Sequence, residues 1–200
     1  MKLWRENQKA YPKFSGNKQF KVELYFLSKI DEGNYFFDKN QRPRPTAKSK
    51  AYDLTTQDDL SLLAKKVIEK SNTLEGNVNR VTDRLSSNNP QLMTLSTLRE
   101  MMKAFAGTDY IDNEELEGMA DIAAEFIDLL SEVRSELNVL NRSERNMIRN
   151  SSIVDSAVML HGYVYLMKEY NRDITKMGLK KAKEMWKQKL KKIDKNTTYV

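Results

Sequence analysis

The chain has 200 residues, of which 40% are hydrophobic, enough for one domain with a packed core. It contains no cysteine and one histidine, which excludes disulfides, thiol nucleophiles and metal sites built from thiolates or several histidines. The formal net charge of +6 is concentrated near the C-terminus, because residues 176–195 hold nine lysines and two acidic residues. A positive charge gathered in one segment favours a polyanionic partner.

The first 55 residues are the least regular part of the sequence. Residues 20–27 have the composition of a strand, with alternating polar and apolar side chains in their first half. Residues 31–34 suggest a turn, and residues 35–37 a second short apolar segment. Pro43 and Pro45 exclude a helix in the loop that follows, because each proline forces the residue before it into an extended conformation.

From Thr56 onward the apolar residues recur at the period of a helix. Thr56 and Asp59 have the spacing of a capping box, in which two side chains satisfy free N–H groups at a helix start. A second helix is expected to begin at Thr94 and to end at Gly107, since glycine adopts the left-handed conformation that closes many helices. Asp112 is expected to cap the longest helix, whose apolar pattern continues to about residue 140.

Two further helices are predicted at residues 152–170 and 176–192, and the second combines a narrow apolar seam with eight of the nine lysines near the C-terminus. The fold class is therefore mainly α, a bundle of about five helices with a small irregular or β-containing N-terminal part. The predicted units are an N-terminal segment over residues 1–55, a helical core over residues 56–172, and a basic C-terminal helix and tail over residues 173–200.

Candidate catalytic residues are few. His161 lies on a predicted helix without the partner residues that acid–base catalysis requires, so a packing or surface role is favoured. Acidic residues near Asp112 fit the positive end of a helix dipole better than a calcium loop, and the sequence has no glycine-rich phosphate loop. We therefore expect no catalytic residue, no metal, no cofactor, and a cytoplasmic protein without a membrane-spanning segment.

The lysine-rich helix is the strongest functional candidate. Like charges three or four residues apart weaken a helix slightly, so contact with a polyanion would offset their repulsion. We expect contacts with the DNA backbone from this helix and, as weaker candidates, from the basic side chains around the prolines. The predicted contacts are Lys180, Lys181, Lys183, Lys187, Lys191 and Lys192, followed by Arg42, Arg44 and Lys48. A solvated face and a membrane-surface contact stay open as alternatives.

Two parts of the sequence resemble a known family. Residues 36–49 have the form Phe-x-Asp-x-Asn followed by a proline and a Lys-Ser pair, which places Asp38, Asn40, Pro45 and Ser49 at the motif positions. Residues 73–79 and the Thr-Leu-Ser helix start within residues 92–98 are similar to a later part of the same family. Over residues 27–172 the chain thus resembles DGQHR-domain proteins, which include the DNA sulfur modification protein DndB. The Asp-Gly-Gln-His-Arg motif itself does not occur in this sequence.

The resemblance implies a role in DNA modification or defence, in which DndB-like proteins act as DNA-binding regulators of phosphorothioation genes. It assigns no role to the motif residues; taken alone, Asp38 and Asn40 suit a turn cap and the prolines a rigid turn. A helical protein-interaction scaffold of phage or modification-system origin is the second reading, and an enzyme fragment completed by another chain is the third. A protein partner or a homo-oligomer is compatible with all of them.

Overall fold

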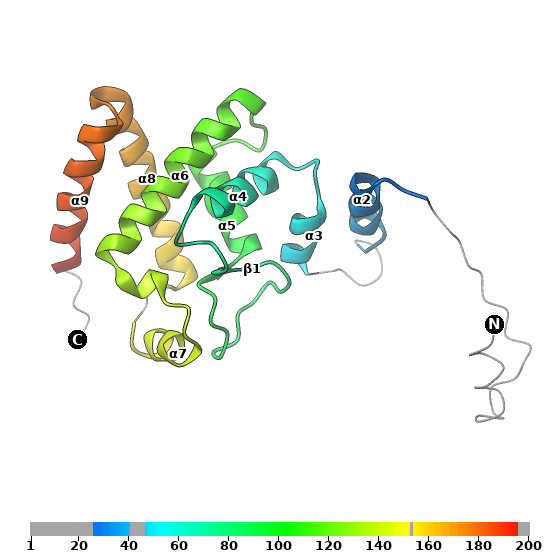
Figure 1. Ribbon diagram of the computed structural model, residues 1–200, viewed down its shortest axis with the longest axis horizontal. Coiled ribbons are helices and arrows are strands. Elements are labelled where there is room, and N and C mark those ends of the chain that lie inside the picture. The colour runs from blue at the N-terminus through cyan, green and yellow to red at the C-terminus, as the bar shows by residue number, and fades with distance from the viewer. Residues whose placement is uncertain (1–25, 41–46, 153, 196–200) are drawn as a thin grey trace, which may run out of the picture.

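The computed structural model describes residues 26–40, 47–152 and 154–195 (Figure 1). In these ranges the chain is mainly α, as predicted, with eight α-helices where the sequence suggests about five. The elements in chain order are α2 (Lys29–Asn40), α3 (Lys48–Leu54), α4 (Asp59–Lys70), β1 (Val78–Asn79), β2 (Met93–Thr94), α5 (Leu95–Ala106), α6 (Asn113–Val133), the 3-10 helix η1 (Ser135–Asn138), α7 (Arg142–Ser151), α8 (Ala157–Met177) and α9 (Leu179–Lys195).

Helix α6 is the spine of the bundle. It packs against α4 on one side and against α9 and α8 on the other, while α5 bridges α4 and α8 (Figure 1). Ile127 and Leu130 of α6 are buried, as the apolar pattern predicts. Phe126 lies beside them and joins an aromatic cluster with one residue from α8 and one from α9, Tyr170 and Trp186, whose ring centroids are 5.6–6.0 Å apart.

Several predicted helix ends are confirmed. Thr94 precedes α5, and its hydroxyl accepts a hydrogen bond from the N–H of Thr97 at 3.2 Å. Gly107 closes the helix with φ 75°, the left-handed conformation that glycine adopts at little cost. Asp112 caps α6 by accepting a hydrogen bond from the N–H of Glu114.

Other boundaries differ from the prediction. The capping box at Thr56 is wrong, because Asp58 caps α4 and accepts a hydrogen bond from the N–H of Ser61 at 3.2 Å. The spine helix ends at Val133 rather than near residue 140, and its apolar pattern continues into η1, where Leu137 is still buried. Leu137 lies beyond the end of α6 but at the spacing that a longer helix would give. The apolar pattern alone therefore does not reveal where α6 ends.

The predicted turn at residues 31–34 is also wrong, since these residues lie inside α2. Ser28 stabilises the start of α2: its hydroxyl donates to the carboxylate of Asp31 at 2.6 Å and accepts from the N–H of Asp31 at 3.2 Å. Gly33 is present because α2 crosses α3 closely, and a Cβ at this position would lie 2.5 Å from the carbonyl oxygen of Leu54. The strand predicted at residues 20–27 falls almost wholly outside the described residues.

A small parallel sheet pairs Val78 with Met93 and Asn79 with Thr94. The sequence analysis did not predict it, because two-residue strands are too short to show a periodic pattern. The buried side chain of Asn77 fixes the pair by accepting a hydrogen bond from the N–H of Leu92 at 2.8 Å. Its amide group donates to the carbonyl oxygens of Thr73 and Leu137. The family-like segment at residues 73–79 therefore organises the middle of the fold.

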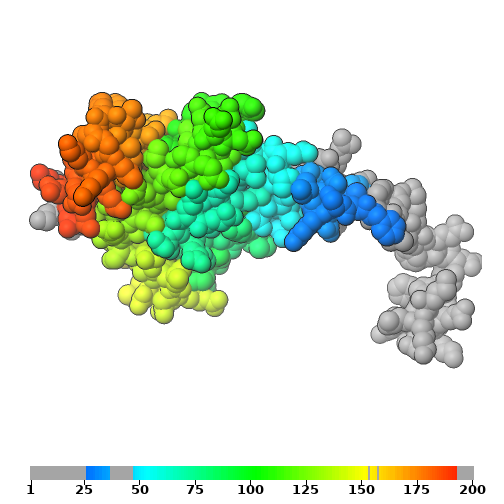
Figure 2. Space-filling model, turned by 45° about the horizontal axis from the view of Figure 1, so that its top comes forward, coloured from blue at the N-terminus to red at the C-terminus, as the bar shows by residue number. Residues whose placement is uncertain are grey.

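Helices α8 and α9 form a hairpin at one end of the molecule, and α2 lies at the opposite end (Figure 2). Helix α8 continues to Met177, so the predicted domain boundary at residue 173 falls inside it. Gly178 then turns the chain with φ 82° and ψ 155°. Ala182, Trp186 and Leu190 of α9 are buried, so the basic helix packs as an integral part of the bundle.

Candidate nucleic-acid interface

The inner flank of α9 holds two of the predicted DNA-contacting lysines in ion pairs. The ammonium group of Lys183 lies 2.8 Å from the carboxylate of Glu125, and that of Lys187 lies 2.6 Å from the carboxylate of Glu132. Both acidic residues belong to α6, against which α9 packs. The hydrogen bonds to these carboxylates raise the pKa of Lys183 and Lys187 above the ordinary value. These two lysines therefore tie α9 to α6, and the paired carboxylates offset their attraction for a phosphate.

The other four predicted lysines of α9 are exposed. Lys180, Lys181, Lys191 and Lys192 have no acidic side chain within ion-pair distance in the part of the chain that the structure describes. At 100° per residue they lie around the side of α9 opposite to Ala182 and Trp186. Lys189 differs from them, because its ammonium group lies 4.0 Å from the ring centroid of Trp186 in a cation–π contact. Glu184 is exposed on the same side of α9 and forms no ion pair in the described structure, so this outer surface carries four lysines against one acidic residue and is net positive.

The weaker candidates around the prolines are only partly described. Arg42, Arg44 and Pro45 lie outside the described residues. Lys48 is exposed, and its backbone N–H donates to the carboxylate of Asp83 at 2.7 Å. Asp38 and Asn40 lie on the last turn of α2, so the backbone there is helical rather than the turn that was expected.

Ser49 of the motif is fully buried and structural. Its N–H donates to Asp83 at 2.7 Å. Its hydroxyl accepts a hydrogen bond from the N–H of Ser96 at 3.1 Å and donates to the hydroxyl of Ser96 at 3.2 Å. Ser96 belongs to the Thr-Leu-Ser helix start, so the two family-like segments meet directly at the beginnings of α3 and α5.

Sequence analysis missed a buried cluster around α7. Arg145 is fully buried and donates hydrogen bonds to the carbonyl oxygens of Glu136, Leu137 and Val139. Arg149, one turn later, donates to the carbonyl oxygens of the loop at residues 86–89. Both guanidinium groups lie within 3.4–3.6 Å of the buried carboxylate of Asp155. The only signal in the sequence is the four-residue spacing of the arginines, which equally suits an exposed basic face.

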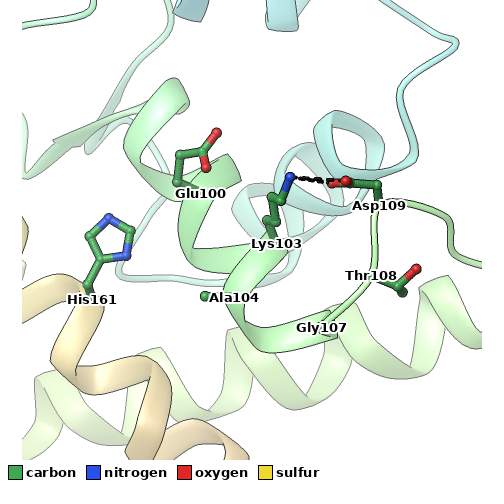
Figure 3. A pocket seen from close by; sticks show the side chains of 7 residues that line it. All are labelled: Glu100, Lys103, Ala104, Gly107, Thr108, Asp109 and His161. Atoms are coloured by element: carbon green, nitrogen blue, oxygen red, sulfur yellow. Dashed lines mark hydrogen bonds and ion pairs between the residues drawn. The ribbon is translucent and has the colours of Figure 1, made fainter.

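A surface pocket of about 430 Å³ lies between α5 and α8 (Figure 3). Its lining includes Glu100 and Lys103 of α5 and His161 of α8, and Lys103 forms an ion pair with Asp109 at 2.8 Å. His161 is thus an exposed surface histidine at the rim of a pocket. A smaller pocket of about 170 Å³ adjoins it, since both pockets share Ala104 and His161.

Two features of the described residues bear on cofactors and membranes. No group of three or more acidic or histidine side chains is arranged there to hold a metal ion. None of the helices in the same ranges combines the length and the apolarity that crossing a bilayer requires.

The fold and its charged surface define a mainly α protein with one strongly basic helix. The sequence matches the family model named DndB, described as DNA-sulfur modification-associated, over residues 14–196. The match covers nearly the whole chain, so the protein belongs to that family, as the residues around Ser49 and Ser96 suggest. Neither a curated protein nor a solved structure matches the sequence.

Proposed function

We propose that this chain is a DNA-associated accessory or regulatory module of a DNA-modification system of the phosphorothioation type, and that it contacts the DNA backbone through the outer surface of α9. The observation that carries the proposal is the division of the α9 lysines. Lys183 and Lys187 are paired with α6, whereas Lys180, Lys181, Lys191 and Lys192 face outward without a partner in the described structure. A phosphate backbone would compensate these four charges.

A salt titration tests this directly. Each phosphate contact releases counterions and adds about −0.9 to the slope of log K against log salt on duplex DNA, so four contacts predict a slope of roughly −3.6. Sequence preference should be weak, because phosphates carry no base information. Binding of fluorescent duplexes of several sequences, with and without phosphorothioate, is measured at several salt concentrations. These data give the salt slope and the sequence preference.

A charge-matched pair of variants separates a specific surface from net charge. The first replaces the outer lysines Lys180, Lys181, Lys191 and Lys192 by Gln. The second makes the same change in charge elsewhere, by Gln at Lys29, Lys66, Lys70 and Arg142. We expect the first variant to lose most of its duplex affinity and its salt dependence, and the second to keep both. Equal losses in the two variants would show that only net charge matters and would reject α9 as the interface.

We also propose that the chain has no catalytic activity of its own. This rests on the single histidine and the absence of cysteine and of a phosphate loop from the sequence. The purified protein should neither hydrolyse nucleotides nor cleave DNA. An activity that disappears in Asp38→Ala or His161→Ala would instead support an enzyme whose site includes these residues.

The alternative, a protein-interaction scaffold, is favoured by one feature at the other end of the molecule. Phe26, just before α2, is 99% exposed, and Ile30, on α2, is 60% exposed. Single apolar residues at a surface are common, but two large ones within five residues of sequence favour a protein partner. If the chain self-associates in sedimentation experiments and Ile30→Asp abolishes this without changing DNA binding, the scaffold function holds beside the DNA-binding one.

A further inference from the structure

Helix α8 carries an exposed stripe that the α9 lysines do not explain. The side chains on its outer face recur at three- or four-residue spacing and lie within about 80° of one another at 100° per residue. They are Val158, His161, Tyr165, Lys168, Arg172 and Lys176, and all six residues are exposed. Along this face one histidine and one tyrosine are therefore followed by three basic side chains.

The stripe borders a continuous groove. The pocket of about 170 Å³ is lined by Tyr165 and Lys168 together with Val164 on α8 and Ala104 on α5. It shares Ala104 and His161 with the pocket of about 430 Å³, so the two pockets together form the groove. Figure 3 shows Ala104 on α5 and His161 on α8. The short side chain of Ala104 gives the groove its depth, because a longer residue there would project between the two helices.

The charges in and around the groove favour an anion. Asp109 pairs with Lys103. Glu100, by contrast, shares the guanidinium of Arg99 with Asp58, so one negative charge remains beside the groove and is outweighed by the two lysines of α8 named below. On the outer face of α8, Glu169 pairs with Arg172. Lys168 and Lys176 have no acidic partner within ion-pair distance among the described residues, so they supply the net positive charge.

The exposed ring of Tyr165 indicates which kind of polyanion fits the groove. Tyr165 is 74% exposed, and its flat ring lies between His161 one turn before it and Lys168 one turn after it. A base can stack on such a ring only if its own face is free, which is the case in a single strand and not inside a duplex. Lys176 lies about 16 Å from Tyr165 along the axis of α8, and Lys180 and Lys181 follow Gly178 at the start of α9.

We propose that the groove between α5 and α8 binds an unpaired stretch of nucleic acid, with one base stacked on Tyr165 and the backbone held by Lys168 and Lys176. The inference rests on the proposed DNA-associated function and specifies the form of the nucleic acid. The α8 stripe and the outer lysines of α9 lie on consecutive helices joined at Gly178, so nucleic acid in which a duplex meets a single strand is the form that would engage both.

The experiment compares binding of a short fluorescent deoxythymidine oligonucleotide and of a duplex of equal length by fluorescence anisotropy. Loss of one stacked base should weaken single-strand binding by Tyr165→Ala about tenfold. Tyr165→Phe, which keeps the ring, should bind like the wild type. Duplex binding should stay within about twofold in both variants, because duplex DNA offers no free base to Tyr165. Circular dichroism of each variant reports that the helices are retained.

An oligonucleotide with abasic positions is a second, independent probe. It keeps every phosphate and removes the bases, so the wild type should bind it as weakly as Tyr165→Ala binds the intact strand, and the substitution should then have no further effect. Unchanged single-strand binding by Tyr165→Ala, or equal losses for the Ala and Phe variants, would overturn the inference and leave the stripe as a surface for another partner.

The outcomes also separate this inference from the proposed function. If α9 lysine variants lose duplex binding while Tyr165→Ala leaves single-strand binding unchanged, the DNA-associated function stands and the groove inference fails. If neither nucleic acid binds the wild-type protein at low salt, both fail together.

Discussion

The hydroxyl of Ser49 accepts a hydrogen bond from the backbone N–H of Ser96 at 3.1 Å, across 47 residues of sequence. It thereby supplies one of the partners that the first turn of α5 requires, because the first N–H groups of any helix have no carbonyl partner within the helix. The two segments that resemble the family are thus joined by one buried contact. The serine of the motif therefore has a structural role, since it joins the start of α3 to the start of α5.

Ser49→Ala should lower the free energy of unfolding by about 1–3 kcal/mol, the cost of leaving a shielded N–H group without its acceptor. Urea denaturation followed by circular dichroism measures this. Ser87→Ala is the control, since Ser87 is exposed and only its backbone carbonyl is bonded in the described structure. Equal stability of the two variants would mean that water replaces the Ser49 hydroxyl.

The central position of α6 is tested by Leu130→Ala. Leu130 is 4% exposed, so the substitution should cost about 2–5 kcal/mol through lost burial and the cavity left behind. Leu140→Ala is a matched control, because Leu140 is 55% exposed and lies beyond the helix end. A loss of less than about 0.5 kcal/mol at position 130 would contradict the packing described for the spine.

Trp186→Ala should cost about 3–5 kcal/mol, since the side chain is fully buried against Phe126 and Tyr170. Its ring N–H would also no longer donate to the carboxylate of Asp173, at 2.8 Å. Deleting residues 176–200 to test the lysines would therefore unfold much of the bundle, and point substitutions are needed instead. Met185→Ala, at a half-exposed neighbouring position, should change the midpoint of thermal unfolding little.

Asp128 should make the protein sensitive to acid. Partial burial by itself would raise the pKa of this carboxyl, but hydrogen bonds from Ser71, Thr73 and Asn72 outweigh it and hold the pKa below the ordinary value. A lowered pKa in the folded state stabilises the fold above the unfolded pKa of about 3.9, and this contribution disappears as the pH falls through the folded pKa.

Asp128→Asn should consequently be less stable than the wild type at pH 7, and the difference should shrink below about pH 4. Urea denaturation at a series of pH values measures both effects. Asp109→Asn, at an exposed pair with Lys103, serves as control and should change stability little at any pH. A difference that stays constant between pH 7 and pH 3 would show that the charge of Asp128 does not contribute.

The parts of the fold that could be predicted are those in which one local signal dominates. Thr94 and Gly107 bound α5 as expected because a hydroxyl cap and a left-handed glycine act within a few residues of sequence. Gly33 misled the prediction, since a glycine normally favours a turn but here permits the close crossing of α2 and α3. That reason depends on the carbonyl of Leu54, which sequence patterns cannot place.

The candidate interface shows the same limit. The spacing of the lysines correctly indicates a basic helix, yet it cannot separate Lys183 from Lys180, because the partner acid of Lys183 lies on α6, 58 residues away. Arg145 is a stronger case. Its type and neighbours suggest an exposed position, but it is fully buried and donates hydrogen bonds to the carbonyl oxygens of Pro90, Glu136 and Val139.

Gly178 sets the angle between α8 and α9, and with it the relative orientation of the α8 stripe and the outer surface of α9. Its φ of 82° with ψ of 155° belongs to a region of backbone space that is open almost only to glycine. No neighbouring atom limits the size of a side chain at this position, so the constraint is purely one of backbone conformation. A substitution here would leave every lysine in place and still change the angle between the α8 stripe and the α9 surface. The protein therefore offers a single position at which the geometry of a charged surface can be altered while its total charge stays the same.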